Sequence, residues 1–237
     1  MITALVLSGG TGARMGGDIP KQYREVSGRT VLSYCIERLY THPGIDAIRI
    51  VAARDWRDQI VEWLHREGWD EKFAGFSEPG ENRQLSIFNG LTDIRVHGHE
   101  DDYVFIHDAA RPLLTEQLIS ACLQAAAGHD GVLPVLRMKD TVYESRDGRT
   151  ITSLLERSSL FAGQAPEVFR LGSYYEANKR LLPDAILKIN GSTEPAVMAG
   201  LDMVMIPGDE NNFKITTKAD LERFGRIVEQ GLRPEMP

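Results

Sequence analysis

A chain of 237 residues with 42% hydrophobic and 26% charged residues fits one large soluble α/β domain that can bury its own core. Its net charge of −7 excludes a general nucleic-acid binder, which needs a basic face, but allows a local cluster of cations around a nucleotide. No apolar run reaches the length of a membrane span and no signal peptide precedes the first strand, so we expect a cytoplasmic protein without a membrane partner.

Strand-like and helix-like segments alternate along the chain. Residues 2–7 form an apolar run of strand formers that predicts a buried parallel strand. The same patterns predict further strands at 45–53, 103–106 and 203–206, and helices at 31–40, 56–66, 84–91 and 116–127. Strands separated by helices indicate a mostly parallel sheet in a Rossmann-like α/β fold.

The two cysteines, Cys35 and Cys122, fall in predicted helices and lack the spacing of metal ligands. We expect reduced thiols in the core, which favours a reducing compartment.

A glycine-rich loop, Ser8 to Gly12, directly follows the first strand and is followed by Arg14 and Lys21. Glycines let backbone N–H groups approach an anion closely, so a strand that opens into a cationic glycine loop suits a nucleoside triphosphate. The loop is not a Walker motif, because no Gly-Lys-Ser/Thr follows it, and not a dinucleotide fingerprint, because Met15 stands where the third glycine would be. A tight turn with solvated charges is the alternative interpretation.

The segment from Gly80 to Ser86 precedes a predicted helix. Gly80 allows a sharp turn, and the Ser86 hydroxyl together with backbone groups can read the amino and carbonyl edge of cytosine. Ser86 could equally serve only as a residue of the helix N-terminus.

The segment from His107 to Pro112 ends the strand predicted at 103–106. Ligands in open α/β sheets bind beyond the carboxyl ends of strands, so Asp108 is expected to face a triphosphate and to bind Mg²⁺. Arg111 either binds ligand or anchors the loop, and His107 is expected to be structural.

The alternation of strands and helices breaks once, at residues 139–161. Two β-prone triplets, 141–143 and 150–152, flank the turn pair Asp147-Gly148. Such a hairpin has too little apolar surface to stand alone, so we expect it to pack on a second subunit. The chain is therefore expected to be a single domain, 1–237, with this β-arm as an excursion.

Five sequence blocks, met in order between residues 7 and 221, resemble the cytidylyltransferases that act on polyol phosphates. That family includes the 2-C-methyl-D-erythritol 4-phosphate enzymes of isoprenoid synthesis and the ribitol 5-phosphate enzymes of wall and capsule synthesis. The blocks are Leu7–Met15 with Pro20–Tyr23, then Gly80-x-x-Arg83-x-x-Ser86, His107–Pro112, the arm from Asp140 to Arg157, and Asn212–Thr216.

The resemblance implies a nucleotidyltransferase of Rossmann-like fold with a protruding β-arm, which uses CTP and Mg²⁺ and dimerises through that arm. In the family the arm arginine reaches the acceptor phosphate in the partner's site. The implied catalytic residues are Arg14, Lys21 and Lys214. The implied nucleotide-binding residues are Leu7, Ser8, Gly9, Gly10, Gly12, Gly80, Arg83, Ser86 and Ala109. The implied acceptor-binding residues are Asp108, Arg111, Thr141, Arg157 and Ala165, and Asp108 is also the implied metal ligand.

The chain departs from the family pattern in two places, both on the acceptor side. Gln164-Ala165-Pro166-Glu167 stands where the family has Gln-Thr-Pro-Gln, and residues 190–195 stand where relatives carry Thr-Asp. We expect the missing hydroxyl at Ala165 to remove an acceptor contact. The nucleotide side is intact.

Three other features favour ribitol 5-phosphate, or a close relative, over 2-C-methyl-D-erythritol 4-phosphate as the acceptor. The first loop reads Gly9-Gly10, the arm reads Asp-Thr-Val-Tyr-Glu-Ser over 140–145, and Gly163-Gln164 precedes Ala165. The methylerythritol phosphate remains the alternative acceptor.

Two rival functions remain for the chain as a whole. The first loop is similar to that of the guanylyltransferase of molybdenum cofactor synthesis, but the arm and residues 107–112 speak against that enzyme. An inactive nucleotide-binding regulator is the rival from another class, and retention of Arg14, Lys21, Asp108 and Lys214 together speaks against it.

Overall fold

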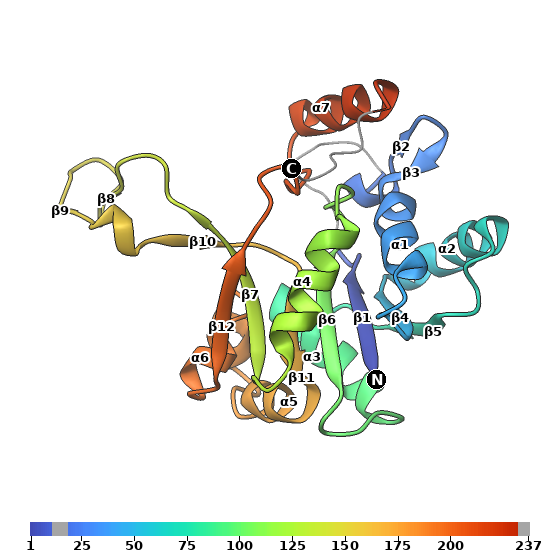
Figure 1. Ribbon diagram of the computed structural model, residues 1–237, viewed down its shortest axis with the longest axis horizontal. Helices are drawn as coiled ribbons and strands as arrows, with labels where there is room; N and C mark the ends of the chain where they lie inside the picture. The colour runs from blue at the N-terminus through green and yellow to red at the C-terminus, as the bar shows by residue number, and fades with distance from the viewer. Residues whose placement is uncertain (11–18, 232–237) are drawn as a thin grey trace.

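The computed structural model describes residues 1–10 and 19–231, and its centre is an eight-stranded sheet (Figure 1). The strand order is β10-β7-β11-β6-β1-β4-β5. Strands β10 and β11 pair with different parts of one edge of β7, and β12 pairs with its other edge. The strands are β1 (Ile2–Leu7), β4 (Ala47–Val51), β5 (Phe73–Ser77), β6 (Tyr103–Asp108), β7 (Gly131–Arg137), β10 (Phe161–Gly163), β11 (Glu167–Arg170) and β12 (Met203–Pro207).

The sheet is mostly parallel, as predicted. Strand β1 runs parallel to β4 and β6, β4 parallel to β5, and β12 parallel to β7. The exceptions, β10 and β11, run antiparallel to β7 and β6. They follow β7 through the arm without a crossover helix, so the chain returns along the sheet in the opposite direction.

Helices cover both faces of this sheet. They are α1 (Val31–Thr41), α2 (Arg54–Glu67), α3 (Arg83–Arg95), α4 (Glu116–Ala126), α5 (Leu171–Lys179), α6 (Glu194–Met198) and α7 (Lys218–Glu229). None of the described helices has the length and apolar character needed to cross a membrane.

Successive side chains of β1 enter different hydrophobic clusters, one on each side of the sheet. Ala4 and Val6 pack with residues of α1, α2 and α4, whereas Leu5 packs with residues of α3 and α5. Because both faces of the strand are buried, its sequence is a continuous apolar run rather than an alternating one. Cys35 and Cys122 are buried free thiols in the first of these clusters, as expected.

The predicted elements occur close to their expected positions, with differences of a few residues at their ends. The predicted helix at 56–66 begins two residues earlier, in α2, and the strand predicted at 45–53 is shorter, in β4. The sequence patterns did not predict β5, β7, β11, α5 or α7. Of these, α7 carries a readable start signal, since Thr217 and Asp220 form a capping box.

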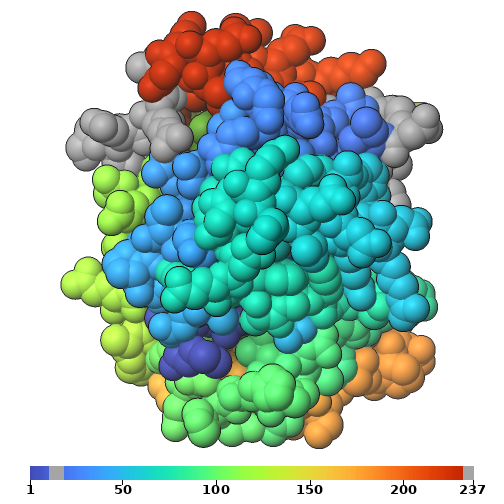
Figure 2. Space-filling view, turned by 90° about the vertical axis from the view of Figure 1, so that its right-hand side faces the viewer, coloured from blue at the N-terminus to red at the C-terminus, as the bar shows by residue number. Residues whose placement is uncertain are grey.

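Helix α7 closes the end of the molecule where the strands of the parallel core finish. Phe224 of α7 packs with Val31, Leu113 and Ile215 in a third buried cluster. Figure 2 shows α7, in red, lying over the two-stranded ribbon of β2 (Glu25–Val26) and β3 (Arg29–Thr30), in blue. The segment before α7 is thereby held against the residues that follow β6.

The β-arm reaches away from the body of the molecule (Figure 1). Its two strands, β8 (Tyr143–Glu144) and β9 (Ser153–Leu154), are shorter than the predicted triplets and pair antiparallel. The turn lies at Asp147-Gly148, as expected. It is held by the Asp147 carboxylate, which accepts hydrogen bonds from the backbone N–H groups of Arg149 and Thr150. These bonds lower the pKa of that carboxyl.

Candidate active site

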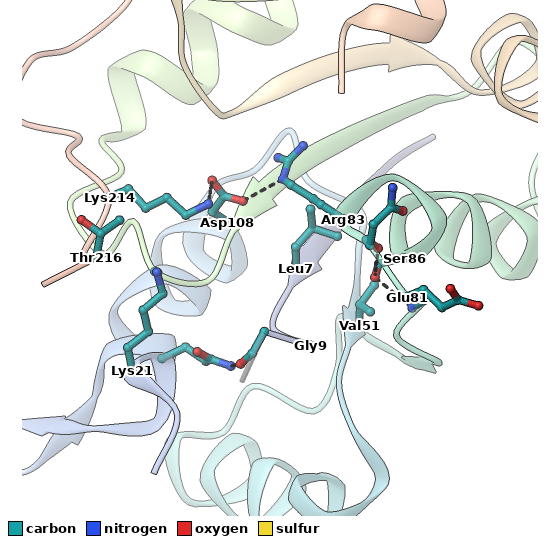
Figure 3. Close-up of a pocket in the computed structure, with 15 residues that line it drawn as sticks. Leu7, Gly9, Lys21, Val51, Glu81, Arg83, Ser86, Asp108, Lys214 and Thr216 are labelled. Atoms are coloured by element: carbon teal, nitrogen blue, oxygen red, sulfur yellow. Dashed lines mark hydrogen bonds and ion pairs between the residues drawn. The ribbon is translucent and has the colours of Figure 1, made fainter. Parts of the chain in front are cut away.

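A cleft of about 500 Å³ opens at the carboxyl ends of β1, β4 and β6 (Figure 3). This volume lies in the range that holds a small-molecule ligand, and the place is where open α/β sheets bind ligands. The lining residues are Leu7, Gly9, Gly10, Lys21, Gln22, Val51, Gly80, Glu81, Asn82, Arg83, Ser86, Asp108, Ala110, Lys214 and Thr216.

The start of the glycine loop is fixed by hydrogen bonds from the side chains of Gln22 and Tyr23. The Gln22 side-chain amide donates to the carbonyl oxygens of Ser8, at 2.7 Å, and Gly10, at 2.8 Å. The Tyr23 hydroxyl exchanges hydrogen bonds with Ser8 and is buried. The Lys-Gln-Tyr run therefore holds the loop as well as supplying Lys21, a role that the sequence pattern alone did not assign.

Gly9 is required by close contact with the next turn of the cleft wall. A Cβ atom there would lie 2.8 Å from the Cβ of Pro79, whereas one on Gly10 would meet no atom of the described residues within 4 Å. Gly12 and Arg14, both predicted to bind the triphosphate, lie outside the described residues.

The turn that carries Gly80 and Ser86 is built at the N-terminus of α3. Asn82 caps the helix by accepting from the Leu85 N–H at 2.8 Å. The Ser86 hydroxyl accepts from the Gly80 N–H at 2.9 Å and donates to the Asn82 carbonyl at 2.8 Å. Ser86 both closes this turn and lines the cleft, so its role in reading a base stays a prediction.

Asp108 is the centre of the cleft's charge. Its Oδ1 lies 3.2 Å from Arg83 Nε, and its Oδ2 lies 3.3 Å from Arg111 Nε and 3.0 Å from Lys214 Nζ. Burial, with only 6% of the residue exposed, would raise the pKa of this carboxyl, but the three cations outweigh burial and hold it well below its ordinary value. Asp108 is therefore ionised throughout the neutral range.

The loop that presents Lys214 is tied to residues far away in the sequence. Arg111 Nη1 donates to the Asn212 carbonyl at 2.7 Å, and the Ile215 N–H donates to the Ala110 carbonyl at 2.8 Å. Gln164 binds both the N–H and the carbonyl of Asp209. Arg111 thus anchors two loops, which is one of the two roles that the sequence left open for it.

His107 is fully buried, and its Nε2 lies 3.0 Å from the Arg111 carbonyl oxygen. Burial lowers the pKa of this histidine to about 4, so the ring is neutral at physiological pH. These features fit the structural role expected from the sequence.

The predicted site residues divide into three groups. Nine line the cleft: Leu7, Gly9, Gly10, Lys21, Gly80, Arg83, Ser86, Asp108 and Lys214. Four lie behind its wall, where Ser8, Ala109 and Ala165 are buried and Arg111 is a loop anchor. Thr141 and Arg157 lie on the arm, where Arg157 Nη1 donates to the Lys139 carbonyl at 2.8 Å.

The structure adds cleft residues for which the sequence gave no individual role, among them Gln22, Val51 and Thr216. Gln22 and Thr216 lie inside recognised blocks, so a block-wide reading could have found them. Val51 ends β4 and has no local motif.

Metal binding by the protein alone does not fit the described residues. They contain no group of three or more His, Cys, Asp or Glu side chains placed to hold a metal ion. Asp108 has both carboxylate oxygens in ion pairs, so a cation there would have to displace Arg83, Arg111 or Lys214. The expectation that Asp108 ligates Mg²⁺ stays a prediction.

The chain was compared with known protein families. A family model described as IspD, 2-C-methyl-D-erythritol 4-phosphate cytidylyltransferase, matches residues 2–230. The bifunctional enzyme IspD/IspF of Paramagnetospirillum magneticum is 35% identical over 224 residues, which cover 92% of this chain and 54% of that enzyme. The chain thus spans about half the length of such bifunctional relatives.

Other relatives match along all or nearly all of their length. The 2-C-methyl-D-erythritol 4-phosphate cytidylyltransferase of Thermotoga neapolitana is 33% identical, covering 96% of each chain. The ribitol-5-phosphate cytidylyltransferase of Streptococcus pneumoniae is also 33% identical, covering 97% of this chain and 100% of that enzyme.

Solved structures share the fold. The 4-diphosphocytidyl-2C-methyl-D-erythritol synthase of Anaerococcus prevotii has a TM-score of 0.81 at 24% identity, covering 97% of this chain and 96% of that one. The IspD enzyme of Francisella tularensis has a TM-score of 0.78 at 25% identity, covering 95% and 98%.

Proposed function

The chain belongs to the IspD family of cytidylyltransferases, and on that premise we propose that it transfers CMP from CTP to a polyol phosphate and releases pyrophosphate. One observation carries this proposal. A single cleft joins the pinned glycine loop, Lys21 and Lys214 with the turn of Gly80 and Ser86, around the charged centre at Asp108.

The reaction joins two anions, so its main demand is for positive charge and alignment. An oxygen of the acceptor phosphate attacks the α-phosphorus of CTP, and the bond from that phosphorus to the bridging oxygen breaks. The electron pair of that bond leaves with pyrophosphate. Lys21 and Lys214 line the cleft where they can compensate the charge that develops, and the cleft walls supply alignment.

No general base is needed for this step. A phosphate monoester has a second pKa near 6, so the acceptor oxygen is largely ionised at pH 7. His107 is unsuited to the role because it is buried and hydrogen-bonded to the loop. The nucleotide base is assigned to the end of the cleft formed by Gly80 and Ser86, where backbone groups and one hydroxyl can read cytosine.

Magnesium is proposed to arrive with the nucleotide. Mg²⁺ is commonly held by substrate phosphates together with one or two carboxylates. Of the two carboxylates among the described lining residues, Asp108 is already in three ion pairs and Glu81 is exposed. The ion is therefore treated as part of the MgCTP substrate. Its chemistry would be to neutralise phosphate charge.

The β-arm is proposed to serve a second copy of the chain. Tyr143, Ile151 and Leu154 are 54%, 63% and 65% exposed on a ribbon too small to be stable alone. Arg157, assigned to the acceptor phosphate, lies on the same arm and not in the cleft of its own chain. A homodimer with exchanged arms would cover the apolar residues and complete each cleft.

The acceptor is proposed to be ribitol 5-phosphate or a close relative. The supporting features are Gly9-Gly10, the arm sequence over 140–145, and Gly163-Gln164, whose glutamine fixes the loop before Lys214. The methylerythritol phosphate is the second candidate, favoured by the family model that matches residues 2–230. Relatives with either acceptor in their names are equally similar, at 33% identity.

The test is pyrophosphate release by the purified chain with each of the four NTPs and a panel of polyol phosphates, with product masses recorded. The proposal expects turnover with CTP, loss of this turnover when EDTA removes Mg²⁺, and the highest kcat/KM for ribitol 5-phosphate. A higher kcat/KM for the methylerythritol phosphate would show that this compound, and not ribitol 5-phosphate, is the acceptor. Preference for GTP, or CTP binding without any turnover, would refute the proposal.

A further inference from the structure

A buried polar network continues from the cleft wall into the protein behind Arg83. Arg83, the first residue of α3, lines the cleft, and its Nε donates to Asp108 Oδ1 at 3.2 Å. On its other side, Nη1 donates to the Ser192 hydroxyl at 2.6 Å, and Nη2 lies 3.6 Å from Glu167 Oε2. The guanidinium is therefore held between two carboxylates, only one of which belongs to the cleft.

Glu167 and Ser192 are themselves joined. The Ser192 hydroxyl donates to Glu167 Oε2, and the two residues are 2% and 8% exposed, with Ser192 the more buried. The Ser192 carbonyl accepts from the Tyr174 hydroxyl at 2.6 Å, which fixes the loop that carries it. Every partner of Glu167 in this network is thus held in place.

This contact unites the two places where the sequence departs from its family pattern. Glu167 belongs to the segment with glutamate where the family has glutamine, and Ser192 belongs to the segment at 190–195. Neither residue lines the cleft, so neither touches a ligand there. Replacing a carboxamide by a carboxylate next to Arg83 adds a negative charge that the family pattern lacks.

We infer that Glu167 is a positioning residue, which with Ser192 fixes Arg83 against Asp108 and whose negative charge lowers the attraction of the cleft for anionic substrates. This inference rests on the proposed function, because the substrates concerned are CTP and a polyol phosphate. Burial raises the pKa of Glu167, and Arg83 and the Ser192 hydroxyl oppose that rise, so the experiments are set at pH 8.

The first variant is Glu167→Gln, which keeps the shape of the side chain and its contact with Ser192 but removes the charge. Arg83 then has one anionic partner instead of two, and the cleft becomes more positive. The expected result is a KM for the polyol phosphate lower by roughly threefold to tenfold, with kcat within about twofold of wild type. Glu62→Gln, which removes an exposed carboxylate on α2, is the matched control and should change neither constant.

The second variant is Ser192→Ala, which removes the hydroxyl that bridges Arg83 and Glu167. Arg83 then loses its close partner on that side, so KM for the acceptor should rise by roughly threefold to tenfold. The double variant Glu167→Gln/Ser192→Ala should deviate from the product of the single effects, because the two residues act on one guanidinium. Glu167→Asp keeps the charge and should stay nearer to wild type than Glu167→Gln.

Three outcomes separate this inference from the proposed function. If the wild-type chain turns over no NTP with any polyol phosphate, the proposed function fails. If the wild type is active but Glu167→Gln leaves KM unchanged or raises it, the inference alone is overturned. Thermal unfolding and calorimetric titration with CTP accompany each variant; a fall in Tm with unchanged KM in both single variants would show a structural role only and would also overturn the inference.

Discussion

The cleft and the β-arm are built on opposite principles. In the cleft, Asp108 is 6% exposed and is held by three cations that come from three separate parts of the chain. In the arm, the hydrogen bonds of the turn are local, and Tyr143, Ile151 and Leu154 are all more than half exposed. The described part of the cleft is held by contacts within one chain, whereas the arm is proposed to offer a surface and an arginine to another.

Substitutions in the cleft and in the arm should therefore have different effects. Changes in the cleft should alter chemistry or stability in every molecule independently. Changes in the arm should alter the activity of a neighbouring chain and leave the stability of the body unaffected. Four predictions test this contrast, ordered by the expected size of the effect.

The largest effect is expected from the cleft lysines. Lys21→Ala and Lys214→Ala should each lower kcat by roughly a hundredfold or more, because a preorganised positive group at the transition state is worth that factor. Steady-state pyrophosphate release measures it. Lys188→Ala, on an exposed turn, is the matched control. Wild-type kcat in both cleft variants would remove the catalytic assignment.

Next comes the stability contributed by Asp108. Asp108→Asn leaves Arg83, Arg111 and Lys214 without their shared anion and should lower the free energy of unfolding at pH 7 by roughly 3 kcal/mol. Because the folded-state pKa of Asp108 is depressed, its contribution is fully present above the unfolded value near 4.

The contribution of Asp108 is lost as pH falls through the folded-state pKa. The difference between wild type and variant should therefore be constant above about pH 5 and shrink below about pH 4. Denaturant unfolding at a series of pH values measures it. A difference that stays the same at pH 3 would contradict the ion-pair account.

The arm is tested by complementation between two variants of low activity. Arg157→Ala should lose activity by about tenfold or more, through the loss of a charge-assisted contact with the acceptor phosphate. Its Tm should match that of the wild type, because the arm makes few contacts with the body.

Mixing Arg157→Ala protein with Lys214→Ala protein should restore about a quarter of wild-type activity. Random subunit exchange makes half of the dimers mixed, and each mixed dimer then has one complete site. Subunit exchange is verified with a tagged chain. No recovery despite verified exchange would mean that the arm acts on its own cleft or not at all.

The smallest effect is expected at Gln22, which touches the glycine loop and not the reacting atoms. Gln22→Ala frees the carbonyls of Ser8 and Gly10 and should raise KM for CTP by roughly threefold to tenfold with little change in kcat. A matched change at Gln124, on α4, should alter neither constant. A loss confined to kcat would place Gln22 in the chemistry rather than in the support of the loop.

The sequence by itself determined the parts of this protein that depend on short-range patterns. The apolar run at 2–7, the glycine loop after it, the helical spacing of 31–40 and the Asp-Gly turn of the arm each report a local conformation. Five ordered blocks were enough to indicate the family and to name nine residues of the cleft.

The tertiary structure decided which of these local pieces touch. Sequence periodicity does not predict that β11 returns antiparallel between β6 and β7, because strand direction depends on the path of the whole arm. Nor does it predict that Glu167 meets Arg83, since 84 positions separate them along the chain. Such contacts depend on the register of the folded sheet and on burial, which raises the cost of an unpaired charge and so brings distant charges together.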